Sequence, residues 1–361
     1  MSPAGGGVSN LVKGRFGGRR HRLLAAMLVL LALLLVAAIG SAMSGAVHIP
    51  LDAMPALLGV ASDSVSTSSA AGHPEYRLWE GVLLDIRLPR LLLGMLTGAA
   101  LAVAGAVMQM SVRNRFVSPT TAGTTQFAVV GLLLVALFAP GTSVLAKMLV
   151  ASACAVAGSA VFLWLLRLLP HRRTSDDVTV PLIGLMLGGV VGAGTTFVAW
   201  RYDLLQSLGS WTAGDLSRVL AGRYELLWLV ALIVLLLYLA ADRLTVASLG
   251  AETATGLGLS YHRTINLTIM AAAVMTAVSV VVVGSLPFLG LVVPNIVSRL
   301  MGDNLRRSLP IIAVGGAVLT LGCDVVGRVV RYPYEVPLSV IMGVVGAGVF
   351  TVLILRGVER G

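Results

Sequence analysis

The feature that most constrains this chain is the length of its apolar runs, which continue without a charged residue for further than a membrane is thick. Residues 264–298 contain no Asp, Glu, Lys or Arg. As one helix, at 1.5 Å per residue, this run would be about 50 Å long, whereas the hydrocarbon core of a bilayer is about 30 Å thick. The run must therefore turn back. Residues 284–287 (Gly-Ser-Leu-Pro) are the predicted corner, because glycine permits unusual dihedral angles and proline cannot continue a helical hydrogen-bond ladder.

Similar runs recur along the 361 residues, of which 57% are hydrophobic and 12% charged. Residues 116–146 are also too long for one crossing, which needs about 20 apolar residues. No charged or polar stretch is long enough to fold as a soluble domain. The sequence therefore predicts an all-α membrane protein, with a disordered basic arm at residues 1–22 and one polytopic domain at residues 23–361. About ten transmembrane helices are predicted, near residues 23–43, 91–112, 123–139, 148–166, 178–200, 226–241, 264–283, 286–301, 311–330 and 336–355.

The placement of Lys and Arg predicts the orientation. Cytoplasmic loops are enriched in basic residues, and with both termini in the cytoplasm most of the 26 basic residues fall on that side. A group that includes Arg87, Arg90 and Arg328 remains on the outer side. The net charge of +10 thus reflects topology. Nucleic-acid binding is not indicated, because the arginines are spread over many loops without a basic patch that contains aromatic residues.

Motifs for enzymatic chemistry are absent from the sequence. Only two lysines occur, and neither belongs to a Walker A sequence; no HExxH and no GxSxG occurs either. Cys154 and Cys323 fall inside apolar runs, where cysteine behaves as a small hydrophobic residue, so we expect neither a disulfide nor a metal site. The sequence predicts no catalytic residue, and energy for any transport would have to come from another protein or from an ion gradient.

An ion-coupled secondary transporter is therefore one interpretation to keep. Such proteins also use broken helices at mid-membrane, but they generally need ionisable residues deep in the bundle. Here Asp215, Asp324 and Glu335 lie near predicted ends of spans. A non-transporting membrane scaffold is a further alternative.

Three stretches resemble one family in order and spacing. They are IRLPRLLLGMLTGAALAVAGAVMQMSVRNRFVSPTTAG (86–123), ASLGAETATGLGLSYHR (247–263), and GSLPFLGLVVPNIVSRLMGDNLRRSLP (284–310) with its continuation DVVGRVVRYPYEVPLSVIMG (324–343). Together they resemble FecCD/BtuC-type permeases, the membrane subunits of ABC importers for iron-siderophores, haem and cobalamin. Asn295, where many relatives have His, and the segment after the second span resemble the siderophore branch; cobalamin and haem permeases remain alternatives.

The resemblance implies a BtuC-like fold of ten helices in the cytoplasmic membrane of a prokaryote. It implies partners as well: ABC ATPase subunits that bind ATP and Mg, an extracytoplasmic siderophore-binding protein, and a second permease subunit that is either identical or a paralogue. No cofactor is expected on this chain itself. The siderophore cannot be named from the sequence.

The resemblance also assigns roles to residues. Arg87, Arg90 and Arg328 would dock the binding protein, since the arginine fork pairs bidentately with carboxylates. The segment 247–263 would couple to the ATPase through a short helix that Ser248 or Thr253 caps, that Glu252 suits at its positive end, and that Gly256 and Gly258 end. The coupling residues are Ser248, Gly250, Glu252 and Gly258. Polar residues in the spans are candidates for the translocation path or for helix packing: Gln109, Thr120, Thr121, Thr124, Thr125 and Gln126.

Overall fold

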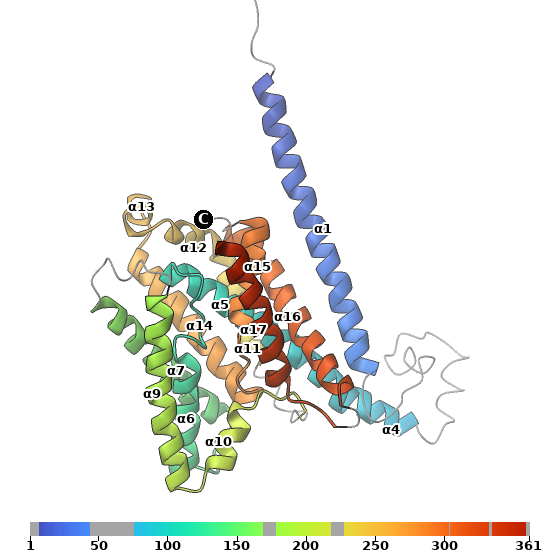
Figure 1. Cartoon of the computed structure of the whole chain (residues 1–361), viewed down its shortest axis with the longest axis vertical. Helices are drawn as coiled ribbons and strands as arrows, with labels where there is room; N and C mark the ends of the chain where they lie inside the picture. The colour runs from blue at the N-terminus through green and yellow to red at the C-terminus, as the bar shows by residue number, and fades with distance from the viewer. Residues whose placement is uncertain are drawn as a thin grey trace, which may run out of the picture.

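The computed structural model describes residues 7–43, 76–168, 178–217, 227–302, 304–331 and 334–358. They form a bundle of helices, from which the N-terminal part of the first helix projects (Figure 1). The elements are α1 (Gly7–Met43), α4 (Tyr76–Gly81), η1 (Val82–Arg87), α5 (Leu88–Val112), α6 (Thr124–Phe138), α7 (Val144–Arg167), α9 (Thr179–Arg201), α10 (Leu205–Thr212), α11 (Leu227–Leu239), α12 (Ala241–Ser248), α13 (Ala251–Gly256), α14 (Tyr261–Val282), α15 (Leu289–Met301), α16 (Leu305–Val329) and α17 (Leu338–Val358).

The helices confirm the predicted all-α membrane fold. Within the described residues, 6 helices are long and apolar enough to cross a membrane, and the pair α11 and α12, bent by 61°, makes up to 7. Three shorter apolar helices, α6, α15 and α17, complete the set. Each of the predicted spans coincides with one of these segments.

Helix α1 begins at Gly7, so most of the predicted arm continues the helix of the first span. The sequence predicts no structure there. The difference has a physical reason, because extending an existing helix adds one hydrogen bond for each residue fixed, whereas starting a helix is costly. Residues 7–22 also contain no proline. Residues 1–6 lie outside the described part of the chain, and the division into arm and permease domain stays a prediction.

The centre of the bundle is α5, which packs against α14, α15 and α16. Glycines allow its backbone to touch theirs. A Cβ added at Gly98 would lie 2.5 Å from the carbonyl oxygen of Gly316, and one added at Gly105 would lie 2.0 Å from that of Gly290. Close crossings of this kind are typical of helices in lipid, where apolar burial between helices gives little driving force.

The predicted corner at residues 284–287 is confirmed. Helix α14 ends at Val282 and α15 begins at Leu289. Gly284 between them has φ of +100°, and a Cβ there would lie 2.5 Å from the carbonyl oxygen of Ala213. Only glycine suits both the left-handed backbone and the close approach. The other long run also turns back, between α6 and α7.

Candidate functional site

Helix α15 contains Pro294, whose missing N–H leaves the carbonyl of Gly290, four residues earlier, without its helical donor. Gln109 on α5 supplies the replacement: its Nε2 donates to the Gly290 oxygen at 3.1 Å, and the pair is buried. Next to it, Asn295 Nδ2 donates to the oxygens of Arg115 at 2.9 Å and Leu291 at 2.8 Å. The side chains of Gln109 and Asn295 therefore supply the hydrogen bonds at the proline break, and these bonds hold α15 against the C-terminal end of α5.

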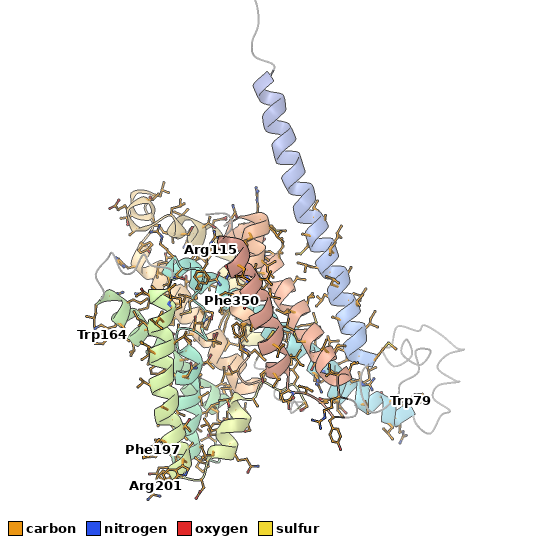
Figure 2. All side chains as sticks on the ribbon, in the orientation of Figure 1. Trp79, Arg115, Trp164, Phe197, Arg201 and Phe350 are labelled. Carbon is orange, nitrogen blue, oxygen red and sulfur yellow. The ribbon has the colours of Figure 1, made fainter. Side chains whose placement is uncertain are left out.

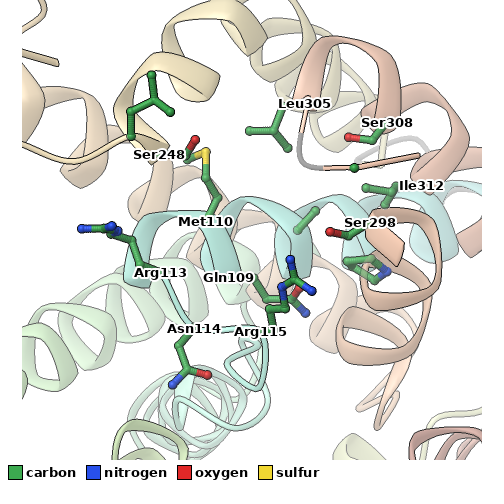
Figure 3. A pocket seen from close by; sticks show the side chains of 14 residues that line it. Gln109, Met110, Arg113, Asn114, Arg115, Ser248, Ser298, Leu305, Ser308 and Ile312 are labelled. Atoms are coloured by element: carbon green, nitrogen blue, oxygen red, sulfur yellow. The ribbon is translucent and has the colours of Figure 1, made fainter. Parts of the chain in front are cut away.

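A cavity of about 340 Å³ opens beside this junction (Figure 3). We call it the basic cavity, because two arginines line it and no carboxylate is among the described residues of its wall. Its lining comes from the end of α5, the end of α12, α15 and the start of α16. The polar lining residues are Gln109, Arg113, Asn114, Arg115, Ser248, Ser298 and Ser308.

The predicted coupling segment, residues 247–263, contributes Ser248 and Leu249 to the wall of the basic cavity. It runs from the end of α12 through α13 to the start of α14, and α12 and α13 stand at the same end of the bundle as the end of α17 (Figure 1). Gly250 joins them with φ of 111° and ψ of 165°, a backbone region that is essentially restricted to glycine. A Cβ added at Gly250 would meet Nη1 of Arg113 at 3.5 Å. The segment therefore lies against Arg113, the C-cap residue of α5, which itself has a left-handed φ of 56°.

The predicted caps of the coupling helix are partly wrong. Gly250, rather than Ser248 or Thr253, is the N-cap of α13, and no side chain caps it. Ser248 instead ends α12, where its Oγ donates to the Thr245 oxygen at 2.6 Å. Glu252 does lie in the first turn of α13 and is exposed. The helix ends at Gly256, and Gly258 follows with φ of +80°.

Helix α12 is also fastened to the start of α16. Arg306 Nη1 donates to Asp242 Oδ2 at 3.1 Å, and its guanidinium lies 5.0 Å from the centre of the Tyr238 ring. Both charged side chains are substantially exposed, so the pair contributes little energy by itself. It connects α12 to the start of α16.

The three arginines predicted to dock a binding protein lie together at the opposite end of the bundle and are buried. Arg90 pairs with Asp324 at 2.8 Å and with Glu335 at 2.8 Å. Arg328 pairs with Asp324 and donates to the Ser41 oxygen at 3.0 Å, and Arg87 donates to Ala42. We call this group, with its two carboxylates, the arginine cluster. Its contacts join α5, α16 and the end of α1; the docking role stays a prediction.

The predicted path residues do not gather around one cavity. Thr124 is fully buried, and its hydroxyl lies 3.1 Å from that of Ser159, so it joins α6 to α7. Thr120 and Thr121 line an apolar cavity of about 570 Å³. Thr125 and Gln126 line another cavity, together with residues of α9 and α10. A role of these residues in the path stays a prediction.

Arg113 was not singled out by the sequence. The sequence shows only that Arg113 follows directly after the long apolar stretch of α5. Other arginines at the ends of spans have the same position, so this feature does not distinguish it. The donor for the Gly290 carbonyl was also missed, although Pro294 indicates that such a donor is needed. Sequence separation of 181 residues between Gln109 and Gly290 hides the pairing.

Comparison with known proteins places these features in a family. The model of the FecCD transport family matches residues 30–356. The petrobactin import system permease YclN of Bacillus subtilis is 43% identical over 274 residues, which cover 76% of this chain and 86% of that protein. The ferric-anguibactin transport system permease FatD of Vibrio anguillarum is 40% identical over 277 residues, 77% of this chain and 87% of that protein.

A solved structure has the same fold. It is an inward-facing conformation of a transporter described as an ABC transporter of the metal-chelate type. The superposition covers 91% of this chain and 98% of that chain with a TM-score of 0.74, at 23% sequence identity. At this identity the likeness supports the fold alone.

Proposed function

Because the chain belongs to the FecCD transport family and is the permease subunit of an ABC importer, we propose that its cargo is an iron(III)-siderophore complex. The observation that carries the proposal is the identity of 43% and 40% with permeases named for petrobactin and ferric-anguibactin. The chain is not itself an ATPase, and hydrolysis of ATP takes place on a partner subunit. Cargo moves inward across the cytoplasmic membrane of a prokaryote, with both termini of this chain in the cytoplasm.

The coupling segment receives the motion of the ATPase. Support comes from its exposure at one end of the bundle, from its glycine joints at Gly250 and Gly258, and from its contact with Arg113. A push on this segment acts directly on α5, which in turn packs against α14, α15 and α16. A second permease subunit, identical or paralogous, completes the translocation path.

The end of the bundle that carries the arginine cluster receives the binding protein. Charge reversal at Arg87 and Arg90 is expected to weaken docking while association with the ATPase is retained. Because both arginines are buried, the same variants need a folding measurement, such as elution as a single species with the ATPase. Folded variants that dock normally would remove the arginines from the docking surface.

The experiment that tests the function is uptake of radiolabelled ferric petrobactin into proteoliposomes. These contain this chain, its co-purified partners and the external binding protein, with ATP inside or absent. Accumulation that needs ATP and survives collapse of ion gradients is expected. Accumulation that ignores ATP and needs an ion gradient would instead identify a secondary transporter, and competition by cobalamin or haem would redirect the choice of cargo.

A further inference from the structure

A groove of about 900 Å³ runs between α7 and α11, which both pack against α14. Alanines from all sides line it: Ala153, Ala157 and Ala160 on α7, Ala240 after α11, and Ala271 on α14. We call it the alanine groove. Methyl side chains fill little of the space between helices, and the three alanines of α7 are exposed. The groove is therefore open to whatever surrounds the bundle.

The alanine groove has the depth of one membrane leaflet. From Thr264 to Val274, both of which line it, it follows α14 for about 15 Å at 1.5 Å per residue, which is half of the roughly 30 Å hydrocarbon core. Thr264 lies near the start of α14, at the end of the bundle that carries α12 and α13 (Figure 1). The groove thus begins at that end and reaches toward the middle of the membrane.

The wall of the alanine groove is apolar although it contains threonines. Thr268 donates its hydroxyl to the Thr264 oxygen at 2.7 Å, and Thr264 donates to the Ser260 oxygen at 3.1 Å. Each hydroxyl is therefore satisfied within α14. Leu236 and Met270 line the same wall and are exposed. Such a surface favours a hydrocarbon chain, which asks for no hydrogen bond.

One charged side chain, that of Arg243, is among the described lining residues of the alanine groove. It lies on α12 and is exposed, and no ion pair joins it to a carboxylate of the described chain. The neighbouring carboxylate, Asp242, pairs instead with Arg306. Arg263, directly before Thr264, is exposed as well. Arginine suits phosphate because its planar fork can donate two hydrogen bonds at once, and basic pockets between membrane helices bind acidic lipid head groups.

Trp164 marks the same end of the groove on α7. It follows Ala157 by seven residues and Ala160 by four, so the three lie on one face of the helix. Its side chain is 58% exposed, and Figure 2 labels it at the edge of the bundle. Tryptophan is enriched where the hydrocarbon core meets the head groups. The level of Trp164 is therefore the level at which a phosphate would be found.

We propose that the alanine groove binds one acyl chain of an anionic phospholipid, and that Arg243 holds its phosphate group at the membrane surface. The inference goes beyond the proposed transport function and is independent of which cargo is carried. In the proposed orientation the lipid belongs to the cytoplasmic leaflet, whose negative surface attracts basic residues. A helix of the second permease subunit is the competing occupant, because helices in lipid also pack on small residues.

The test measures lipid retained by the full chain with its co-purified partners. The complex is titrated in detergent with phosphatidylglycerol or with phosphatidylcholine, and bound lipid is counted by native mass spectrometry. Wild type is expected to retain phosphatidylglycerol in preference. Arg243→Gln should weaken this retention about fivefold, which corresponds to ~1 kcal/mol for an arginine near the head groups at 1.4 kcal/mol for each tenfold change. Arg201→Gln is the control, because it removes the same charge at the opposite end of the bundle (Figure 2).

A matched pair of alanine substitutions tests the seat of the acyl chain. Ala157→Leu places a larger apolar side chain in the groove, whereas Ala193 on α9 is also exposed but does not line it. Retention of phosphatidylglycerol should fall for Ala157→Leu and not for Ala193→Leu. Elution of each variant as a single species with the ATPase establishes that it is folded.

Three results would overturn the proposal. The first is equal retention of phosphatidylglycerol by wild type and folded Arg243→Gln. The second is equal retention of phosphatidylglycerol and phosphatidylcholine by wild type, which would remove the role of the charged head group. The third is release of the second permease subunit by Ala157→Leu without a change in lipid retention, which would identify the groove as a contact between helices of two subunits.

Discussion

Asp324→Asn is expected to destabilise the bundle strongly, because Asp324 is the buried counter-ion of two arginines. Its side chain is 2% exposed and accepts from both Arg90 and Arg328. Removing one partner of a buried ion pair costs about 3–5 kcal/mol, since the remaining charge stays buried and uncompensated. Arg90 keeps a second carboxylate, that of Glu335, at 2.8 Å. We therefore expect the lower end of this range, about 3 kcal/mol of unfolding free energy.

Glu335→Gln provides the matched control. It removes a carboxylate from the same Arg90 by the same chemical change, but the Glu335 side chain is 39% exposed. An ion pair with this access to solvent contributes about 0–1 kcal/mol. The assay is SDS titration in mixed micelles, with the free energy of unfolding measured for both variants and for wild type. Equal losses in the two variants, or a loss below about 1 kcal/mol for Asp324→Asn, would refute the argument from burial.

Three further predictions concern α5 and the coupling segment. Gly105→Ala should lower the free energy of unfolding by about 1–3 kcal/mol in the same titration, since its Cβ would lie 2.0 Å from the Gly290 oxygen. Gly322→Ala is the control and should unfold like wild type, because a Cβ there meets nothing within 4 Å. Gln109→Leu should cost about 1–3 kcal/mol because it leaves the Gly290 carbonyl buried without a donor, and an unchanged midpoint would contradict the assigned hydrogen bond. Gly250→Ala places a side chain in a backbone region that costs about 1–3 kcal/mol for any residue but glycine. We expect this strain to alter the joint between α12 and α13 and to lower the amount of cargo taken up per ATP hydrolysed. An unchanged ratio of uptake to hydrolysis would show that Gly250 does not transmit motion from the ATPase.

The positions of the spans could be predicted because membrane crossing depends on local hydropathy and length. The corner at residues 284–287 followed from the same arithmetic together with the properties of Gly284 and Pro287. The start of α1 could not be predicted, because sequence patterning does not indicate how far a helix continues beyond the apolar run. Boundaries of this kind depend on propagation rather than on hydrophobicity.

The site was less predictable, because its contacts join residues far apart in the sequence. Arg90 lies 234 residues from Asp324 in the sequence. From the sequence alone its guanidinium is expected to be exposed at the end of a span, but in the folded bundle it is paired with the Asp324 carboxylate. The spacing of Asp324 and Arg328, at i and i+4 on one helix, was a local signal for such pairing. No comparable local signal connects Gln109 to Gly290.

The interruption of α15 at Pro294 connects this helix to α5. Pro294 removes a hydrogen bond from α15, and Gln109 restores it from another helix, so the break becomes a fixed joint between α5 and α15. At the same end, Arg113 of the α5 cap meets Gly250 of the coupling segment. Helices that touch backbone to backbone, as at Gly105, have little freedom to slide past one another. Under the proposed coupling role, a displacement of residues 247–263 would move α5 and α15 together, and bending would fall to the glycine joint at Gly250.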